Sequence, residues 1–320
     1  MNTMCKIFSV LVLYLSGLFA FAADFPNKPV KIVVSAAPGS SPDLTARVLA
    51  QQLSTLWKQP VVVEDVPGAG GNLAAEKVAK SLSDGHTVLF SSAAVLYFNK
   101  ALYPKLSYDL EKDFTPVSRV SKTPNLLVVP VNSPYKSVQD LVQAAKVKPG
   151  EIRFGSGGSG SSMHVIAEVF SQKAHVKFEH IPYKSSTQMV QELLAGQIDF
   201  TFQNIAVVMP FVKAGRIKPL AIVGEGRSVL LPQVPTFREA GLPGFDIRNW
   251  QGVLAPAATP RPIIELLSRE TAKALALPDI RDRLVARGSV PKPSAPDQFD
   301  QFVREEVAKV SKVIREGNIR

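Results

Sequence analysis

Short runs of glycine, serine and amide residues recur in the chain, each at the end of an apolar run. The densest is residues 155–162 (GSGGSGSS), and the others are residues 36–43 (AAPGSSPD), 91–93 (SSA) and 203–204 (QN). Small residues let the backbone approach a ligand closely, and the free N–H groups of a following helix attract a negative group. Ligands of open α/β sheets gather outside the carboxyl ends of strands. The four turns therefore predict one anion site, which suits a carboxylate as well as a phosphate.

The residues expected to contact the anion offer hydroxyls, amides or backbone N–H groups at these strand ends. They are Ser40, Ser41, Asp43, Ser92, Ala93, Ser156, Gly157, Ser161, Ser162, Gln203 and Asn204. Asp43 has an alternative role, because a carboxylate in the first turn of a helix interacts favourably with the helix dipole. His164, close to the Gly/Ser run, is interpreted as a capping or packing residue.

The Gly/Ser run has two other interpretations. Gly155, Gly157 and Gly160 satisfy G-x-G-x-x-G, and Glu179 follows near the distance of a ribose-binding acid, as in a dinucleotide site. The motif lies in the middle of the chain, however, and an exported protein rarely meets NAD. The second alternative is a solvated flexible loop, because Gly and Ser runs often have no fixed structure.

The sequence lacks the patterns of the common catalytic and metal-binding sites. Ser159 has Gly157 before it, but Ser161 stands where the second glycine of G-x-S-x-G belongs. No Gly-Lys-Ser/Thr follows a glycine run, and the four histidines form no H-E-x-x-H. We therefore expect no catalytic residues, no metal ligands and no cofactor, and favour a binding protein over an enzyme.

The first 22 residues have the order of a secretory signal peptide. Lys6 precedes an apolar run over residues 7–19, and small residues follow, so cleavage is expected near Ala22/Ala23. The apolar run is shorter than the roughly 20 residues that span a bilayer. Cys5, the single cysteine, lies in this segment, so the exported chain should use neither disulfides nor thiol chemistry.

The chain is basic, with a formal net charge of +10. A positive balance raises the local concentration of anions. The Lys and Arg residues are scattered, however, and form no block that resembles a nucleic-acid-binding tract. Nucleic acid is therefore not an expected partner.

The elements that must position the turns alternate between strand and helix. Apolar runs at residues 31–35, 60–64 and 86–90 are separated by helical patterns, and a second series of the same kind begins after residue 123. This alternation predicts an α/β fold with parallel sheets. Ser41 is predicted as the N-cap of the first helix, and Ser137 and Asp140 are spaced like a capping box.

The end of the chain is predicted to be helical. Three amphipathic patterns cover residues 262–275, 278–287 and 296–314, with no strand expected between them. Such a run of helices suggests that the chain returns to cover the first sheet. We therefore predict a discontinuous domain 1, residues 23–122 and 225–320, with domain 2, residues 123–224, inserted in it.

Motifs in order along the exported chain resemble a known family. They are residues 29–34 (PVKIVV), 38–43 (PGSSPD), 61–72 (VVVEDVPGAGGN), 84–87 (DGHT), 102–104 (LYP), 113–117 (DFTPV), 182–184 (PYK), 194–199 (LAGQID), 213–215 (KAG), 234–236 (VPT) and 239–244 (EAGLPG). Together they resemble the receptors of tripartite tricarboxylate transporters, also called Bug receptors. The resemblance implies a type II periplasmic-binding-protein fold, in which two α/β domains joined by hinge strands close on a ligand like a Venus flytrap.

The resemblance also implies a function. Such receptors are periplasmic and hold one carboxylate of a small organic acid through main-chain amides, hydroxyls and water, and deliver it to a membrane permease. Lys184 and Ser185, in and directly after the motif at 182–184, join the candidate ligand-binding residues on this ground, and we expect a monomer. An exported sensor input for a two-component system and an exported enzyme remain the alternatives.

Four features depart from the family pattern. The first turn reads Pro38-Gly39-Ser40 where a Pro-Gly-Gly-Ser run is usual, and Gln188 stands where a proline is favoured. Ser185 stands where the family favours a glycine, and Gln203 occupies a position that aspartate commonly holds. Gln203 replaces an acceptor-only carboxylate by a neutral amide that can donate. The expected consequence is better tolerance of a second negative group on the ligand.

Overall fold

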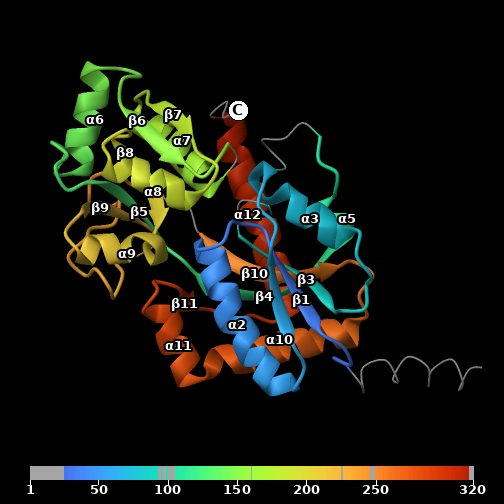
Figure 1. The fold of residues 1–320 in the computed structure, drawn as a ribbon. Coiled ribbons are helices and arrows are strands. Elements are labelled where there is room, and N and C mark those ends of the chain that lie inside the picture. Colours follow the sequence, from blue (N-terminus) through green and yellow to red (C-terminus); the bar gives the residue numbers. More distant parts are fainter. Residues whose placement is uncertain are drawn as a thin grey trace, which may run out of the picture.

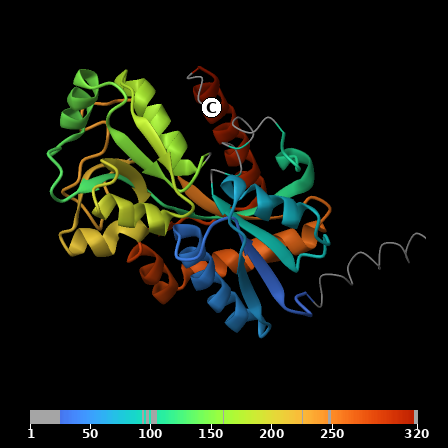
Figure 2. The ribbon, with the colours of Figure 1, turned by 45° about the horizontal axis from the view of Figure 1, so that its top comes forward.

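Two lobes lie side by side in the computed structural model, each built on a β-sheet with helices packed against it (Figure 1, Figure 2). The structure describes residues 25–92, 95, 99, 105–159, 161–224, 226–245 and 249–316. The predicted signal peptide, its cleavage position near Ala22/Ala23 and Gly160 of the Gly/Ser run lie outside these residues.

The first sheet is a mixed sheet of six strands, rather than the predicted parallel one, in the order β11-β4-β10-β3-β1-β2. The strands are β1 (Val30–Val34), β2 (Val61–Asp65), β3 (Thr87–Ser92), β4 (Phe114–Lys122), β10 (Trp250–Pro256) and β11 (Val290–Pro291). β1 pairs in parallel with β2 and β3, whereas β10 pairs antiparallel with both β3 and β4. The strand and helix alternation predicted for residues 31–90 is confirmed by this parallel part.

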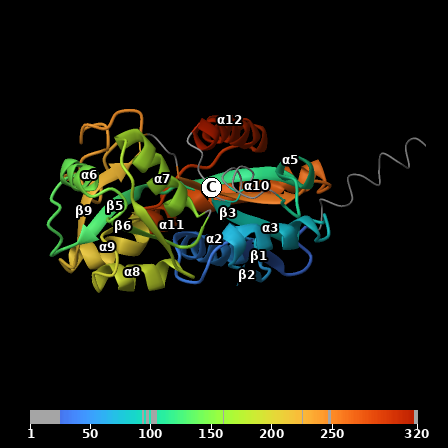
Figure 3. The ribbon, with the colours of Figure 1, turned by 90° about the horizontal axis from the view of Figure 1, so that it is seen from above.

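Helices cover both faces of the first sheet. On one face lie α2 (Ser41–Trp57), α10 (Arg261–Ala276) and α11 (Pro278–Val285), and on the other lie α3 (Asn72–Ala79) and α12 (Pro296–Glu316). Figure 3 shows α2 and α12 on opposite sides of the sheet. Side chains of a strand alternate between its faces, so Ile32 and Val34 pack with α2 while Val33 packs with α3. The short η1 (Ala69–Gly71) and α5 (Leu110–Asp113) complete the lobe.

The second sheet has five strands in the order β7-β6-β8-β5-β9. They are β5 (Asn125–Pro130), β6 (Arg153–Ser156), β7 (Glu179–Pro182), β8 (Phe200–Asn204) and β9 (Ile217–Val223), and the helices are α6 (Val138–Val147), α7 (Ser162–Ala174), α8 (Ser186–Leu194) and α9 (Ile205–Lys213). Leu127 packs with α6 and α7, whereas Leu126 packs with α8 and α9 on the opposite face. The predicted capping box at the start of α6 is confirmed, because Ser137 Oγ accepts from the Asp140 N–H at 3.1 Å and Asp140 Oδ2 accepts from the Ser137 N–H at 3.1 Å.

The segment 226–245 packs on the second lobe, although the sequence placed it in domain 1. The ring centroids of Phe237 and Phe245 lie 4.4 Å apart, and Phe237 lies 5.8 Å from Phe202 of β8. The Ile222 N–H donates to the carbonyl of Pro235 at 2.8 Å, which continues the sheet edge. We therefore propose that the second domain boundary lies near residue 249 rather than 225.

The chain crosses between the lobes twice. β4 ends at Lys122 and β5 begins at Asn125, while the return crossing leads from β9 to β10, which begins at Trp250. The two crossings are hydrogen-bonded to each other, since the Thr123 N–H donates to the Asn249 carbonyl at 3.1 Å. The predicted fold class, two α/β domains joined by hinge strands, is confirmed.

The three helices predicted at the end of the chain are present as α10, α11 and α12, but the expectation of no strand between them is wrong, because the two-residue β11 pairs with β4. In addition, β10 was not predicted from the sequence. β10 lies inside the first sheet, and all seven of its residues are buried. A strand buried on both faces has no alternation of polar and apolar residues to reveal it. Gly252 also interrupts the apolar run. A methyl group there would collide with the ring of Phe299, so the glycine permits α12 to pack directly on the strand.

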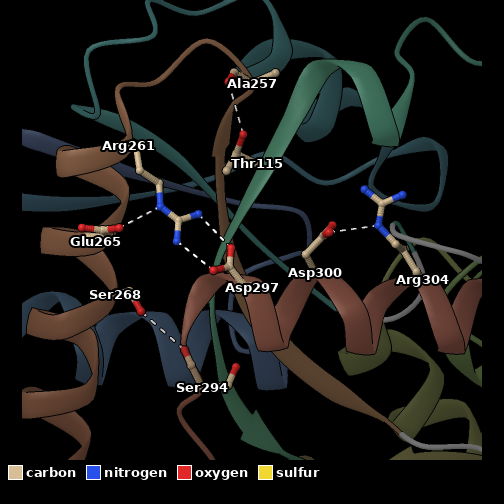
Figure 4. A network of polar contacts seen from close by, with 9 residues as sticks. All are labelled: Thr115, Ala257, Arg261, Glu265, Ser268, Ser294, Asp297, Asp300 and Arg304. Carbon is tan, nitrogen blue, oxygen red and sulfur yellow. Dashed lines mark hydrogen bonds and ion pairs between the residues drawn. The ribbon is translucent and has the colours of Figure 1, made fainter.

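A network of charged residues fastens α12 to α10 on the outside of the first lobe (Figure 4). Arg261 donates to both carboxylate oxygens of Asp297 at 2.9 and 3.0 Å and to Glu265 at 2.8 Å. Such a forked pair fixes orientation. The Ser268 hydroxyl adds a bond to the Ser294 carbonyl at 3.4 Å.

If the segment 226–245 stabilises the second lobe, shortening Phe237 should destabilise the protein. Phe237→Ala removes a ring that is 1% exposed, and we expect a loss of about 3 to 5 kcal/mol in the free energy of unfolding. Denaturant unfolding followed by fluorescence measures it. Val229→Ala, on a side chain that is 77% exposed in the same segment, is the control and should change stability by less than about 0.5 kcal/mol. Equal effects of the two variants would contradict this packing.

Candidate functional site

A cavity of about 550 Å³ lies between the lobes, and both lobes contribute to its wall. The first lobe and the return crossing supply Ser35, Ala36, Ala37, Ser40, Ser41, Pro42, residues 67–71, Ser92, Val95, Asn249 and Gln251. The second lobe supplies Asn125, Gly157, Gly158, Ser159, Ser161, Ser162, Met163, residues 183–186, Gln203 and Asn204. The small-residue turns recognised in the sequence thus converge on one cavity.

Most of the sequence-predicted site residues lie in this wall. They are Ser40, Ser41, Ser92, Gly157, Ser161, Ser162, Lys184, Ser185, Gln203 and Asn204. Ala93 lies outside the described residues. Asp43 and Ser156 are not among the lining residues and stand behind the turns that they were expected to extend.

Asp43 holds the first turn together from behind. Its Oδ2 accepts from the Gly39 N–H at 2.8 Å, and its Oδ1 lies 2.5 Å from Arg47 Nε. Arg47 also binds Asp65 at 2.6 Å, and burial together with the Asp43 charge raises the pKa of Asp65. These contacts give Asp43 a structural role in the first turn.

Ser156 shapes the Gly/Ser loop instead of facing the cavity. Its hydroxyl donates to the carbonyl of Gly158 at 3.0 Å and accepts from the Gly158 N–H at 3.2 Å. The same hydroxyl lies 2.7 Å from Nε2 of His180. Gly158 has φ of +112°, a conformation that glycine adopts readily. Ser156 thus supports the turn at Gly158 from behind.

Five helices begin at the cavity. Their N-caps, all of them lining residues, are Ser40 for α2, Gly71 for α3, Ser161 for α7, Ser185 for α8 and Asn204 for α9. The first N–H groups of a helix have no partner within it, and the N-terminus carries a partial positive charge. The five helix starts therefore make the cavity attractive to an anion.

The caps themselves are local features of the sequence. The side chains of Ser161, Ser185 and Asn204 accept from N–H groups of their own first turns at 3.2 to 3.4 Å. The predicted cap of the first helix is displaced by one residue, because Ser40 is the N-cap and Ser41 the first helical residue. At the α3 cap, Gly71 has φ of +95°, and an added methyl group would meet the Ser35 carbonyl. The backbone can approach the first strand so closely only at a glycine.

Neutral polar groups make up most of the wall, and charged ones are scarce. The described lining residues include no Asp or Glu, and Lys184, which is exposed, is their one Lys or Arg. Burial raises the pKa of Tyr183, so its hydroxyl stays protonated and can donate. The Gln251 amide donates to Ser41 Oγ at 2.8 Å, which leaves the proton of the Ser41 hydroxyl for another acceptor.

Gln203 presents a donor to the cavity wall. Its Oε1 accepts from the Asn204 N–H at 2.7 Å, which fixes the orientation of the amide. Its Nε2 is buried and has no hydrogen-bond partner among the described residues. The hydroxyl of Ser40 is likewise buried and has no hydrogen-bond partner among the described residues. An unpaired buried polar group costs free energy, so a ligand group that accepts from these donors is favoured.

Two stacked histidines lie behind the Gly/Ser loop. The ring centroids of His164 and His180 lie 4.1 Å apart, and both rings stack with Phe154. Burial lowers the pKa of His164 to about 4, and burial with the neighbouring His164 lowers that of His180 to about 4. The interpretation of His164 as a packing residue is confirmed, since its side chain is 4% exposed.

The sequence missed lining residues of two kinds. Residues 67–71 line the cavity but were recognised only as a turn. Their position directly before a predicted helix was the signal that could have identified them. Asn125, Asn249 and Gln251 come from the hinge crossings, where single amides in strands give no signal of a ligand site. Their role depends on the return of the chain, which local patterns do not reveal.

The described residues contain neither a cluster of metal-binding side chains nor a helix that could span a membrane. In the part of the chain that the structure covers, no three His, Cys, Asp or Glu side chains gather as a metal site would require. No helix within the described ranges combines the length and the apolar character of a membrane span.

Comparisons with known proteins point to one family. The family model described as "Tripartite tricarboxylate transporter family receptor" matches residues 45–319. "Protein BugT" of Bordetella pertussis is 36% identical over 296 residues, which cover 92% of this chain and 91% of that protein.

Solved structures of similar proteins agree in fold. The structure described as "R. palustris Rpa4515 with adipate" matches with a TM-score of 0.89 and 33% identity over 92% of this chain and 99% of that one. "MatC (Rpa3494) from Rhodopseudomonas palustris with bound malate" matches with a TM-score of 0.86 and 33% identity over 91% of this chain and 100% of that one.

The buried histidine pair predicts a loss of stability in mild acid. A histidine whose folded pKa is near 4 stays neutral in the folded protein, whereas the unfolded chain takes up a proton below about pH 6.5. The contribution of such a histidine to the free energy of unfolding is therefore complete above pH 6.5 and is lost as the pH falls towards 4. For the more deeply buried His164 we expect a loss on the order of 3 kcal/mol.

Denaturant unfolding between pH 7 and 4 measures this effect. His164→Phe keeps a stacked ring without a titrating group and should lose less stability over this range than the unmodified protein. His175→Asn, on an exposed histidine at the end of the same helix, is the control and should lose as much as the unmodified protein. Parallel pH profiles for all three proteins would refute the role of the pair.

Proposed function

The chain belongs to the tripartite tricarboxylate transporter family of receptors, and from this premise we propose that it captures a small organic carboxylate between its lobes for delivery to a membrane permease. One observation carries the proposal: five helix N-caps from both lobes line a single cavity whose described lining residues include no Asp or Glu. Such a wall favours an anion without a buried counter-ion.

The carboxylate class fits the donors of the wall. Serine hydroxyls, the Tyr183 hydroxyl and the Gln203 amide can all donate to carboxylate oxygens. Related proteins described with adipate and with malate, each a dicarboxylate, support the same class for this chain. A cavity of about 550 Å³ has room for an acid of this size together with water.

An enzymatic role is less well supported. General acid and base catalysis needs a titrating group with an adjusted pKa within reach of the substrate. The two histidines with lowered pKa values stand behind the Gly/Ser loop and are not lining residues. A receptor needs only oriented donors and a hinge, and we propose that the protein is not an enzyme.

The location and partners follow from the same proposal. We propose that the first 22 residues direct export to the periplasm and are removed near Ala22/Ala23. The receptor then acts as a monomer that presents its closed form to the permease. A sensor role would use the same closed form but a different membrane partner.

Ligand binding should stabilise the protein without consuming the ligand. A small acid that binds the folded state raises the free energy of unfolding by about 2.7 kcal/mol at a concentration one hundred times its Kd. Thermal unfolding in the presence of succinate, malate, adipate, citrate and benzoate measures this effect, with succinamide as an uncharged control. NMR spectra recorded after incubation with the protein should show that the acid is chemically unchanged. Failure of every carboxylic acid in a broad panel, or turnover of a bound acid, would refute the receptor function.

Gln203 should determine tolerance of a second carboxylate. In Gln203→Asp one oxygen can accept from the Asn204 N–H while the other carries negative charge at the cavity, so the affinity for a bound dicarboxylate should fall by about tenfold or more. Isothermal titration measures the change. Gln203→Leu removes the donor without adding charge, and should weaken binding less. The variant Gln203→Asp would contradict the proposal if it bound the dicarboxylate equally well or more tightly.

A further inference from the structure

A pair of amide side chains joins the two hinge crossings at the cavity wall. Asn125 is the first residue of β5, at the end of the outward crossing, and Asn249 precedes β10 on the return crossing. Nδ2 of Asn249 donates to Oδ1 of Asn125 at 3.3 Å. Both residues line the cavity, and Asn125 is 1% exposed.

The pair leaves one donor and one acceptor unused. Asn125 Nδ2 and Asn249 Oδ1 are buried and have no hydrogen-bond partner among the described residues. The result does not depend on how the amides are oriented. An amide that gives its oxygen to the pair keeps its nitrogen, and the amide that gives its nitrogen keeps its oxygen. If both amides are turned over, the donor and the acceptor exchange places but remain one of each.

The rest of the wall adds further donors. Gln203 Nε2 is a buried donor of fixed orientation, and the helix starts add backbone N–H groups. Carboxylate oxygens satisfy donors, but they have no hydrogen for the acceptor of the amide pair. Burial of an unpaired acceptor is unfavourable, so the ligand should bring a hydrogen-bond donor as well as its carboxylate.

We propose that the Asn125 and Asn249 pair recognises a hydroxyl group, so that the cargo is a hydroxylated carboxylate; this inference rests on the proposed receptor function. A hydroxyl donates one hydrogen and accepts with its lone pairs, which matches one unused acceptor and one unused donor. The bound hydroxyl then bridges the two crossings of the hinge.

Other small groups match the pair less well. An ammonium group only donates, so it leaves the amide N–H unpaired, and it lies near helix N-termini that carry partial positive charge. The described lining residues include no Asp or Glu whose negative charge could neutralise the ammonium group. A keto group only accepts and leaves the amide oxygen unpaired. Amino acids and keto acids are therefore expected to bind more weakly than hydroxy acids of the same length.

Acids matched in carbon chain test the proposal. Malate, succinate and aspartate share four carbons and differ at one position by OH, H or NH₃⁺, and 2-hydroxyglutarate, glutarate and glutamate form the same series with five. The comparison is made at the chain length that binds. There, isothermal titration should show that the hydroxy acid binds at least about tenfold more tightly than the plain acid and the amino acid. If succinate or glutarate binds as tightly as its hydroxy acid, the inference is wrong while the receptor function stands. If no carboxylic acid binds, both are wrong.

Asn249→Ala tests the residue assignment. Loss of one amide of the pair should bring the affinity ratio of hydroxy acid to plain acid down to within about threefold of one. Asn132→Ala, on an exposed asparagine of the second lobe outside the cavity wall, is the matched control and should keep the full ratio. A thermal unfolding curve of each variant confirms folding. A ratio in Asn249→Ala equal to that of the control would overturn the assignment.

Discussion

The start of an α-helix leaves backbone N–H groups that the helix itself cannot satisfy, and this constraint organises the whole molecule. Five helices begin at one cavity, three of them on the second lobe and two on the first. Each is preceded by a strand or a short turn of small residues, so the sheets aim the helix starts and the turns allow close approach. The two sheets therefore support one cavity whose wall comes from both lobes.

The hinge follows from the same arrangement. On one face of each sheet the core is built from that lobe's own strands and helices, and the described chain crosses between the lobes at two places, which touch at Thr123 and Asn249. Charged networks such as the one around Arg261 fasten helices on the outer surface and leave the cavity to neutral groups. Rigid lobes and a narrow junction are the conditions for closure by rotation. The amides of the junction also line the cavity, so ligand contacts and hinge geometry share the same residues.

Much of this architecture could be predicted from the sequence, because its signals are local. Apolar runs, turns and caps located the parallel strands, the capping box at Ser137 and eight of the lining residues, and the family resemblance added Lys184 and Ser185. β10 could not be found, because a strand buried on both faces lacks alternation and Gly252 serves a helix far along the chain. Asp43 lies outside the cavity wall and supports the first turn, and spacing alone cannot tell such a side chain from one that faces a ligand. The amides of the hinge were missed because only the return of the chain brings them to the cavity.

The scarcity of charged side chains in the cavity has a consequence for the unloaded protein. A buried arginine would bind an anion strongly, but it would be left as an isolated charge at a high desolvation cost whenever the cargo departed. Helix termini and neutral amides have no such requirement, because water can replace the cargo at each of them. Under the proposed receptor function, release of the ligand therefore leaves no isolated buried charge among the described lining residues.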